Sequence, residues 1–233
     1  MACTIHYGET VINYELLLMD RKSLEIAVHP DKRVVVKAPA VYSIDTIRAR
    51  VAKRVRWITK QIAYFNRFEP RTPPRQYVGG ESHLYLGRKY RLKISLASRD
   101  QVLLKSGYFY IQCIRSDPTY IRKLMTTWYQ RHAFVYLTKM VDNCWNNFDQ
   151  ATHIKPKLRI QWLKTRWGSL SPRGQLTLNT DLIKTPKECI EYVIVHELCH
   201  LKHHNHSNEF YRLLDRTMPD WLTRKHKLEM ALS

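Results

Sequence analysis

The chain has 233 residues, 44% hydrophobic and 25% charged, which is typical of a globular protein with one large domain or two small ones. No run of about 18 apolar residues exists, so a membrane-spanning helix is excluded. Lys and Arg number 39 against 20 Asp and Glu, for a net charge of +19. This charge predicts attraction to polyanions such as nucleic acid or nucleotides, and a basic solvated surface is the alternative.

The N-terminal segment and the cysteines both predict a cytoplasmic protein. The first 20 residues carry Glu9, Glu15 and Asp20 among their apolar residues, and they lack the basic start and uninterrupted apolar stretch of a secretory signal. The five cysteines are scattered and form no C-x-x-C pair, so they predict neither a disulfide framework nor a cysteine zinc ribbon. We expect free thiols in a reducing compartment.

The first part of the chain is predicted to contain strands followed by one long helix. Polar and apolar positions alternate over the first 40 residues, for example at 24–28 and 34–36, which predicts short strands. Apolar residues at 44–65 then recur at spacings of three and four, the stripe of an amphipathic helix that Ser43 can cap. The opposite face is cationic and suits solvent or phosphate groups equally. Its cations are Arg48, Arg50, Lys53, Arg54, Arg56, Lys60 and Arg67.

A linker and a second set of strands follow this helix. Residues 69–80 contain three prolines and two glycines, which predicts a loop. Gly87 and Gly107 mark turns between strand-like segments. These segments are 83–86, 90–96, 101–104 and 108–114.

The next elements are a second long helix and two further strands. Asp117 and Pro118 form a strong helix start, and the helix is expected over about residues 119–147. Strand-like segments at 158–162 and 176–178 then flank a Pro-Arg-Gly turn.

The most informative chemistry lies in the last predicted long helix. Thr185 can cap this helix, Pro186 suits its first position, and Glu188 completes a capping box. The helix contains the sequence His196-Glu197-Leu198-Cys199-His200, an H-E-x-x-H motif.

The spacing of this motif suits a metal ion. His196 and His200 lie one turn apart on one helix face, so both imidazoles can bind a single ion at about 2.0–2.1 Å. Glu197 lies about 100° around the helix, where it can contact a water bound to the metal without being a ligand. Zinc lowers the pKa of such a water toward about 7, and a neighbouring carboxylate accepts its proton. The motif therefore predicts a zinc-dependent hydrolase with Glu197 as general base.

A third ligand is expected from the histidines that follow. On a straight helix His204 would lie about 12 Å from His196, whereas nitrogens that share one tetrahedral ion are about 3.5 Å apart, and His203 fails similarly. Asn205 suits a left-handed helix end, and His206 follows that turn. We expect one Zn²⁺ per chain, replaceable by Ni²⁺ or Co²⁺. The predicted ligands are His196, His200 and His206.

Several short motifs around this site match a known family. They are Arg166-Trp167-Gly168-Ser169, Leu178-Asn179, Tyr192-Val193, the segment from His196 to Leu201, and Asn205-His206-Ser207. These motifs resemble the YgjP-like metal-dependent hydrolases, which are zincin-type metallopeptidases related to the SprT-like group. The resemblance is dense over about residues 156–220, and it implies the same three histidine ligands with Glu197 as catalytic acid/base. Leu170 differs from the family, in which Cys is frequent at this position.

The predicted fold class is α+β. A zincin-like catalytic domain is expected at residues 117–233, after an N-terminal β-rich region with one long amphipathic helix at 1–116. Arg166 is a candidate for binding a carboxylate or phosphate of the substrate, and Gly168 would permit close backbone approach. Trp167 is expected to pack into the core.

Three functions remain open from the sequence alone. The leading one is a zinc metallopeptidase that uses metal-activated water on a peptide or protein substrate. The alternative is a metal-dependent phosphohydrolase in which the surplus cations hold the phosphates of a nucleotide. The third is a basic nucleic-acid-binding protein with a structural zinc. Structural zinc sites usually have four protein ligands, so three histidines beside a glutamate favour an enzyme.

Overall fold

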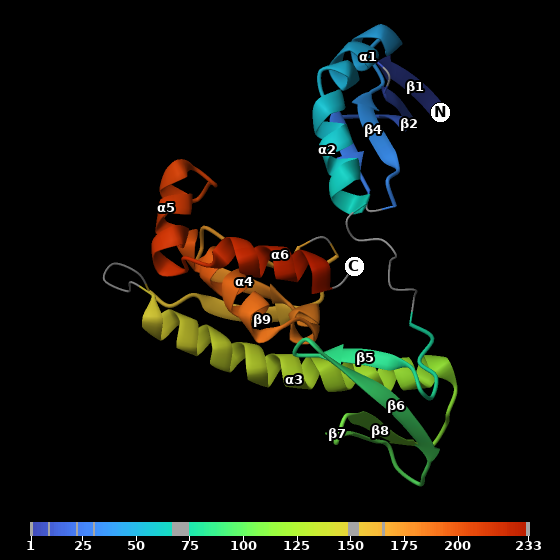
Figure 1. Ribbon diagram of the computed structural model, residues 1–233, viewed down its shortest axis with the longest axis vertical. Helices are drawn as coiled ribbons and strands as arrows, with labels where there is room; N and C mark the ends of the chain where they lie inside the picture. The colour runs from blue at the N-terminus through green and yellow to red at the C-terminus, as the bar shows by residue number, and fades with distance from the viewer. Residues whose placement is uncertain are drawn as a thin grey trace. The chain divides into compact units, whose positions relative to one another are not determined.

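The computed structural model describes residues 2–8, 10–21, 23–29, 31–66, 75–148, 154–164 and 166–231. The chain forms two compact units, which we call unit 1 (Met1–Arg71, with Ser233) and unit 2 (Thr72–Leu232) (Figure 1). The prolines of the predicted linker lie outside the described residues. Among the residues described, no helix is both long and apolar enough to cross a membrane.

Unit 1 is a four-stranded sheet packed against two helices, with a hydrophobic core of its own. The strands follow the order β1-β2-β4-β3, in which β2 and β4 are parallel and the other pairs antiparallel. Val36, Ile47 and Ile58 are fully buried where sheet and helices meet. The strands are β1 (Ala2–Tyr7), β2 (Thr10–Met19), β3 (Glu25–Val28) and β4 (Val34–Pro39).

The helical part of unit 1 differs from the single helix that the sequence predicts. It consists of α1 (Ile44–Ala52) and α2 (Val55–Asn66). Lys53 and Arg54 form the turn between them, and each N–H bonds a carbonyl three or four residues earlier. The buried positions keep their helical spacing through this turn, which is why the apolar pattern does not reveal the break. Ser43 caps α1 as predicted, because its hydroxyl accepts from the N–H of Thr46 at 3.2 Å.

Unit 2 begins with a second four-stranded sheet, in the order β5-β6-β8-β7. Helix α3 (Pro118–Asn147) packs on this sheet: fully buried Phe109 meets Trp128 of the helix edge-on, with ring centroids 4.9 Å apart. Asp117 caps α3, accepting from the N–H of Tyr120 at 2.9 Å. The expected boundary at 116/117 therefore falls inside unit 2, whose sheet and helix share one core. The strands are β5 (Ser82–Tyr85), β6 (Arg88–Leu96), β7 (Gln101–Lys105) and β8 (Tyr108–Cys113).

The rest of unit 2 places α4 (Lys187–Cys199) at its centre. A three-stranded sheet has the order β10-β11-β9, so β10 lies at an edge. Helix α4 packs against α3, α5, α6 and β10, and most of its residues are buried. The other elements are β9 (Lys157–Gln161), β10 (Gly168–Leu170), β11 (Gln175–Asn179), the 3₁₀ helix η1 (Thr180–Lys184), α5 (Asn208–Thr217) and α6 (Trp221–Ala231). The α+β class is confirmed.

The start of α4 is not capped in the predicted way. The hydroxyl of Thr185 donates to the carbonyl of Leu182 at 2.8 Å, and α4 begins at Lys187 without a side-chain cap. The same carbonyl also accepts from the backbone N–H of Thr185 at 2.9 Å, so Thr185 closes the end of η1 and its hydroxyl does not cap α4.

Candidate metal centre

The H-E-x-x-H motif lies at the C-terminal end of α4, and the helix ends earlier than the sequence predicts. His200 is already its C-cap, with a right-handed backbone and an N–H that bonds the carbonyl of Glu197 at 3.1 Å. Asn205 does not adopt the positive φ expected of it, so the prediction that it ends the helix is wrong. The chain leaves the helix at His200 and crosses a short loop. Helix α5 then begins after Ser207, whose hydroxyl accepts from the N–H of Phe210 at 3.4 Å.

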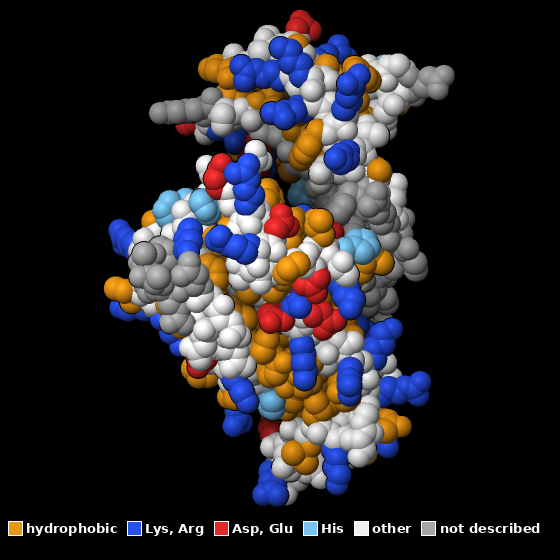
Figure 2. Space-filling view, turned by 60° about the vertical axis from the view of Figure 1, so that its left-hand side comes forward, with side chains coloured by type: hydrophobic (Ala, Val, Ile, Leu, Met, Phe, Trp, Pro, Cys, Tyr) orange, Lys and Arg blue, Asp and Glu red, His pale blue; other side chains and the backbone are white. Residues whose placement is uncertain are grey.

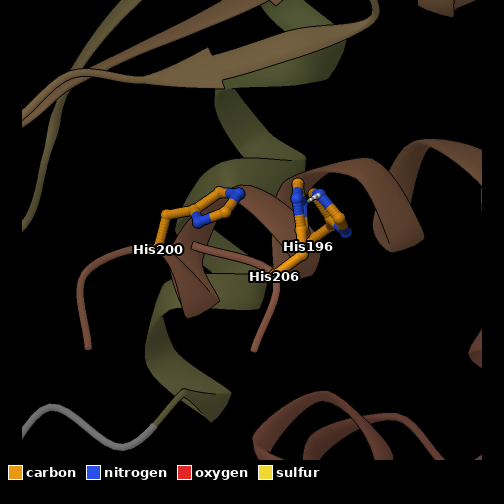
Figure 3. Close-up of side chains that lie close together, drawn as sticks. All are labelled: His196, His200 and His206. Atoms are coloured by element: carbon orange, nitrogen blue, oxygen red, sulfur yellow. Dashed lines mark hydrogen bonds between the residues drawn. The ribbon is translucent and has the colours of Figure 1, made fainter. Parts of the chain in front are cut away.

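This loop returns His206 to the two histidines of α4. Potential ligand atoms of His196, His200 and His206 all lie within 4.8 Å of one another (Figure 3). The Nε2 atoms of His196 and His206 are 3.0 Å apart. His203 and His204 do not join the group, which is the one cluster of three or more potential ligands found in the described part of the chain. The structure thus brings together the three histidines that the sequence selects.

The surroundings of the three rings fit a metal ion. Nδ1 of His200 donates to the carbonyl of His203 at 2.9 Å, because a carbonyl can only accept. This tautomer leaves the lone pair of Nε2 free for a metal. Phe210 is fully buried and packs against all three rings, with centroids 4.7 to 5.0 Å away, so it forms an apolar wall behind them. The donor set of three imidazoles suits zinc.

Burial keeps the site in the protonation state that a metal needs. It lowers the pKa of His196 to about 4, and the neighbouring His200 and His206 add to this effect. Burial also lowers the pKa of His206, although this side chain is more exposed. Neutral imidazole is the form that coordinates a metal, so neither histidine needs to release a proton near pH 7.

Glu197 is buried beside the cluster, with 8% of its surface exposed. Burial raises its pKa to about 7, while a backbone hydrogen bond from Leu170 and the charge of Arg166 act in the opposite direction. Strand β10 passes very close to this carboxylate: a Cβ added at Gly168 would lie 3.1 Å from Oε1 of Glu197. The close approach expected at Gly168 is therefore made to the predicted general base.

Asn179 positions the backbone near the cluster, a role that the sequence did not reveal. It is buried, and its Nδ2 donates to the carbonyls of Leu163 at 2.8 Å and Arg166 at 3.0 Å. Its Oδ1 accepts from the N–H of Asp181 at 3.0 Å. Asn179 thus fixes the backbone at Arg166, next to the cluster. The one sequence signal was its place in a motif shared with a family.

Arg166 and Trp167 differ in how far their side chains are buried. The Arg166 side chain is exposed and forms no ion pair with any described residue, yet its charge acts on Glu197. Trp167 is partly buried against the core of unit 2, as predicted.

An α+β unit with three clustered histidines beside a buried glutamate has the features of a metallopeptidase. The family model for the YgjP-like metallopeptidase domain matches residues 22–231 of the chain, and the chain belongs to this family. The predictions of a metallopeptidase, and hence of a metal-dependent hydrolase, are confirmed. No curated protein matches the chain.

Two solved structures are similar to parts of the chain. One is the metallopeptidase zymogen abylysin of Pyrococcus abyssi, with 23% identity and a TM-score of 0.37 over 41% of this chain and 94% of that chain. The other is the metallopeptidase zymogen jannalysin of Methanocaldococcus jannaschii, with 21% identity and a TM-score of 0.37 over 42% of this chain and 97% of that chain.

Proposed function

We propose that His196, His200 and His206 bind one zinc ion and that unit 2 hydrolyses peptide bonds with it. The observation that carries this proposal is the convergence of three histidine side chains within 4.8 Å of one another. Three histidine ligands leave a fourth position open, as in catalytic zinc sites. Ni²⁺ or Co²⁺ would suit the same donors. When bound, the metal supplies polarisation of the scissile carbonyl and of the attacking water.

Glu197 acts as the general base in this proposal. Its carboxylate accepts the proton of the attacking water and returns it to the leaving amine nitrogen. The N–H of Leu170 orients the carboxylate, and burial excludes bulk water from it. Both effects restrict the motion of the carboxylate and reduce the reorganisation that proton transfer requires.

Arg166 binds the substrate in the same proposal. Its guanidinium is exposed, has no acidic partner among the described residues, and lies close enough to influence Glu197. A carboxylate of a peptide would pair with it. Arg166→Gln is expected to raise KM several-fold for peptides with an acidic residue while zinc content stays unchanged. The matched control is Arg159→Gln, an exposed arginine on β9.

The decisive experiment compares zinc-loaded wild type with Glu197→Gln and Glu188→Gln. Both variants remove a carboxylate from α4 at nearly constant size, but Glu188 lies at the other end of the helix, paired with Lys227 at 3.0 Å. On unfolded casein, Glu197→Gln should lose at least about 100-fold in turnover and keep its zinc. Glu188→Gln should stay near wild type. Hydrolysis of nucleoside triphosphates without any cleavage of casein would reject the peptidase proposal.

A further inference from the structure

Unit 1 contains a cavity of about 450 Å³ that has no part in the metal centre. It opens beside the turn between α1 and α2. Its volume lies within the range of about 300–1,000 Å³ found for small-ligand sites. The lining residues are Leu24, Ile26, Arg50, Lys53, Arg54 and Trp57.

The charges around this cavity are unbalanced. Residues 44–66 contain six Lys or Arg and one acidic residue, Asp45, and all six cations are exposed. None of the six forms an ion pair with any residue that the structure describes. The guanidinium of Arg50 lies 4.7 Å from the ring centre of Tyr42, a contact that leaves its charge uncompensated. Figure 2 shows Lys and Arg side chains gathered over the helices of unit 1, with hydrophobic side chains between them.

The cavity also presents an aromatic and apolar surface. Trp57 is 39% exposed, which is unusual for the largest apolar side chain. Leu24 and Ile26 are half-buried and pack on the core of unit 1, so they form a fixed floor. A single small space therefore offers both a flat aromatic face and three cations.

The combination of three cations with an aromatic face favours one class of polyanion over the others. An acidic peptide or an anionic lipid surface needs only the cations, whereas a base joined to phosphate uses both parts of the cavity. Guanidinium groups bind phosphate oxygens in pairs, and an indole stacks on the face of a base. In a duplex the base faces are already stacked on one another, so only an unpaired base can reach the indole.

We propose that this cavity binds single-stranded nucleic acid, with a base stacked on Trp57 and the phosphates held by Arg50, Lys53 and Arg54. This proposal is independent of the metal centre, because every lining residue belongs to unit 1.

The test measures binding of a fluorescein-labelled oligo(dT) of about 20 nucleotides to the full-length protein by fluorescence anisotropy over a range of salt. One variant carries Arg50→Gln, Lys53→Gln and Arg54→Gln. The matched control carries Arg88→Gln, Lys89→Gln and Lys105→Gln, three exposed cations of unit 2, and so loses the same net charge. Only the first variant should weaken binding. The slope of log affinity against log salt should fall by about 2, because each single-strand phosphate contact contributes about 0.7.

Trp57 provides a second readout. Trp57→Ala should weaken binding at least about five-fold without changing the salt slope, and Trp57→Phe should retain most of the affinity because it keeps an aromatic face. Duplex DNA should bind more weakly than oligo(dT). Thermal unfolding shows whether Trp57→Ala remains folded. The glutamine variants test the proposal independently of the Trp57 substitution. Equal loss in the two triple variants would overturn the proposal, as would absent binding at low salt. Tighter binding to poly-glutamate or to phosphatidylserine vesicles than to oligo(dT) would overturn it too.

Discussion

Gly168 on β10 and Glu197 on α4 are in such close contact that a side chain at Gly168 would collide with the carboxylate group. An added Cβ would lie 3.0 Å from Cγ of Glu197, and 3.2 Å from Cγ1 of Val193 on the same helix. Real Cβ atoms rarely come this near, so the glutamate or the strand would have to move by a few tenths of an ångström. The absence of a side chain at Gly168 thus sets the position of the proposed base.

Gly168→Ala is therefore expected to lower peptidase turnover about ten-fold while zinc content and folding remain near wild type. The physical reason is displacement of the Glu197 carboxylate, because small misplacements of a reacting group cost one or two orders of magnitude in rate. Gly79→Ala is the control, since an added Cβ there meets nothing within 4 Å. Full activity of Gly168→Ala would show that the position of Glu197 tolerates this shift.

Asn179→Ala is expected to destabilise unit 2 by about 2–4 kcal/mol, because the substitution leaves two carbonyls and one N–H without their partner. Urea unfolding measures this change. Asn146→Ala is the control, since Asn146 is exposed on α3 and its loss should change stability by less than about 0.5 kcal/mol. Equal effects of the two substitutions would show that the Asn179 hydrogen bonds contribute nothing.

His206→Ala is expected to weaken zinc binding by at least about ten-fold, because two histidines remain to hold the ion. His204→Ala is the matched control: it lies in the same loop, is exposed, and stays outside the cluster. Zinc titration against a chelator of known affinity measures both. If His206→Ala keeps its affinity for zinc and His204→Ala loses it, the third ligand is His204 and not His206.

The sequence was sufficient to select the three clustered histidines, because helix geometry fixes the relation between positions four apart. The prediction that Asn205 ends the helix was wrong, since α4 ends at Cys199. The selection did not depend on this detail. Once His196 and His200 fix the position of an ion, a third histidine needs only a reversal of the chain to reach it.

The sequence alone could not predict contacts between distant parts of the chain. The hydrogen bonds of Asn179 to Leu163 and Arg166 join residues 16 and 13 positions apart, and no periodic pattern encodes them. The break between α1 and α2 was hidden for another reason, because the buried residues keep their spacing across Lys53 and Arg54. The family resemblance marked these motifs as important but gave no information on their geometry.

In the metal-free protein, Glu197 and His196 should affect stability with opposite dependence on pH. Burial raises the pKa of Glu197 from 4.5 to about 7, so between these values the folded protein holds a proton that the unfolded chain has released. Stability therefore falls as the pH rises through this window. Burial lowers the pKa of His196 from 6.5 to about 4, so here the unfolded chain binds the extra proton and stability falls as the pH drops. His206, whose pKa is also lowered, acts in the same direction as His196.

Glu197→Gln removes the contribution of the glutamate, so the difference in stability between this variant and wild type measures that contribution. Relative to wild type, the variant should gain stability as the pH rises from 4.5 to about 7, by up to about 3 kcal/mol, because it no longer has to ionise a buried carboxyl. His196→Asn should show the reverse, a relative gain as the pH falls from 6.5 to about 4. Urea unfolding in the presence of a chelator, repeated across this range, measures both differences. Because each variant is compared with wild type at the same pH, the titration of all other groups cancels. If the free energy of unfolding of each variant changes with pH in parallel with that of wild type, neither group titrates differently in the folded and unfolded states.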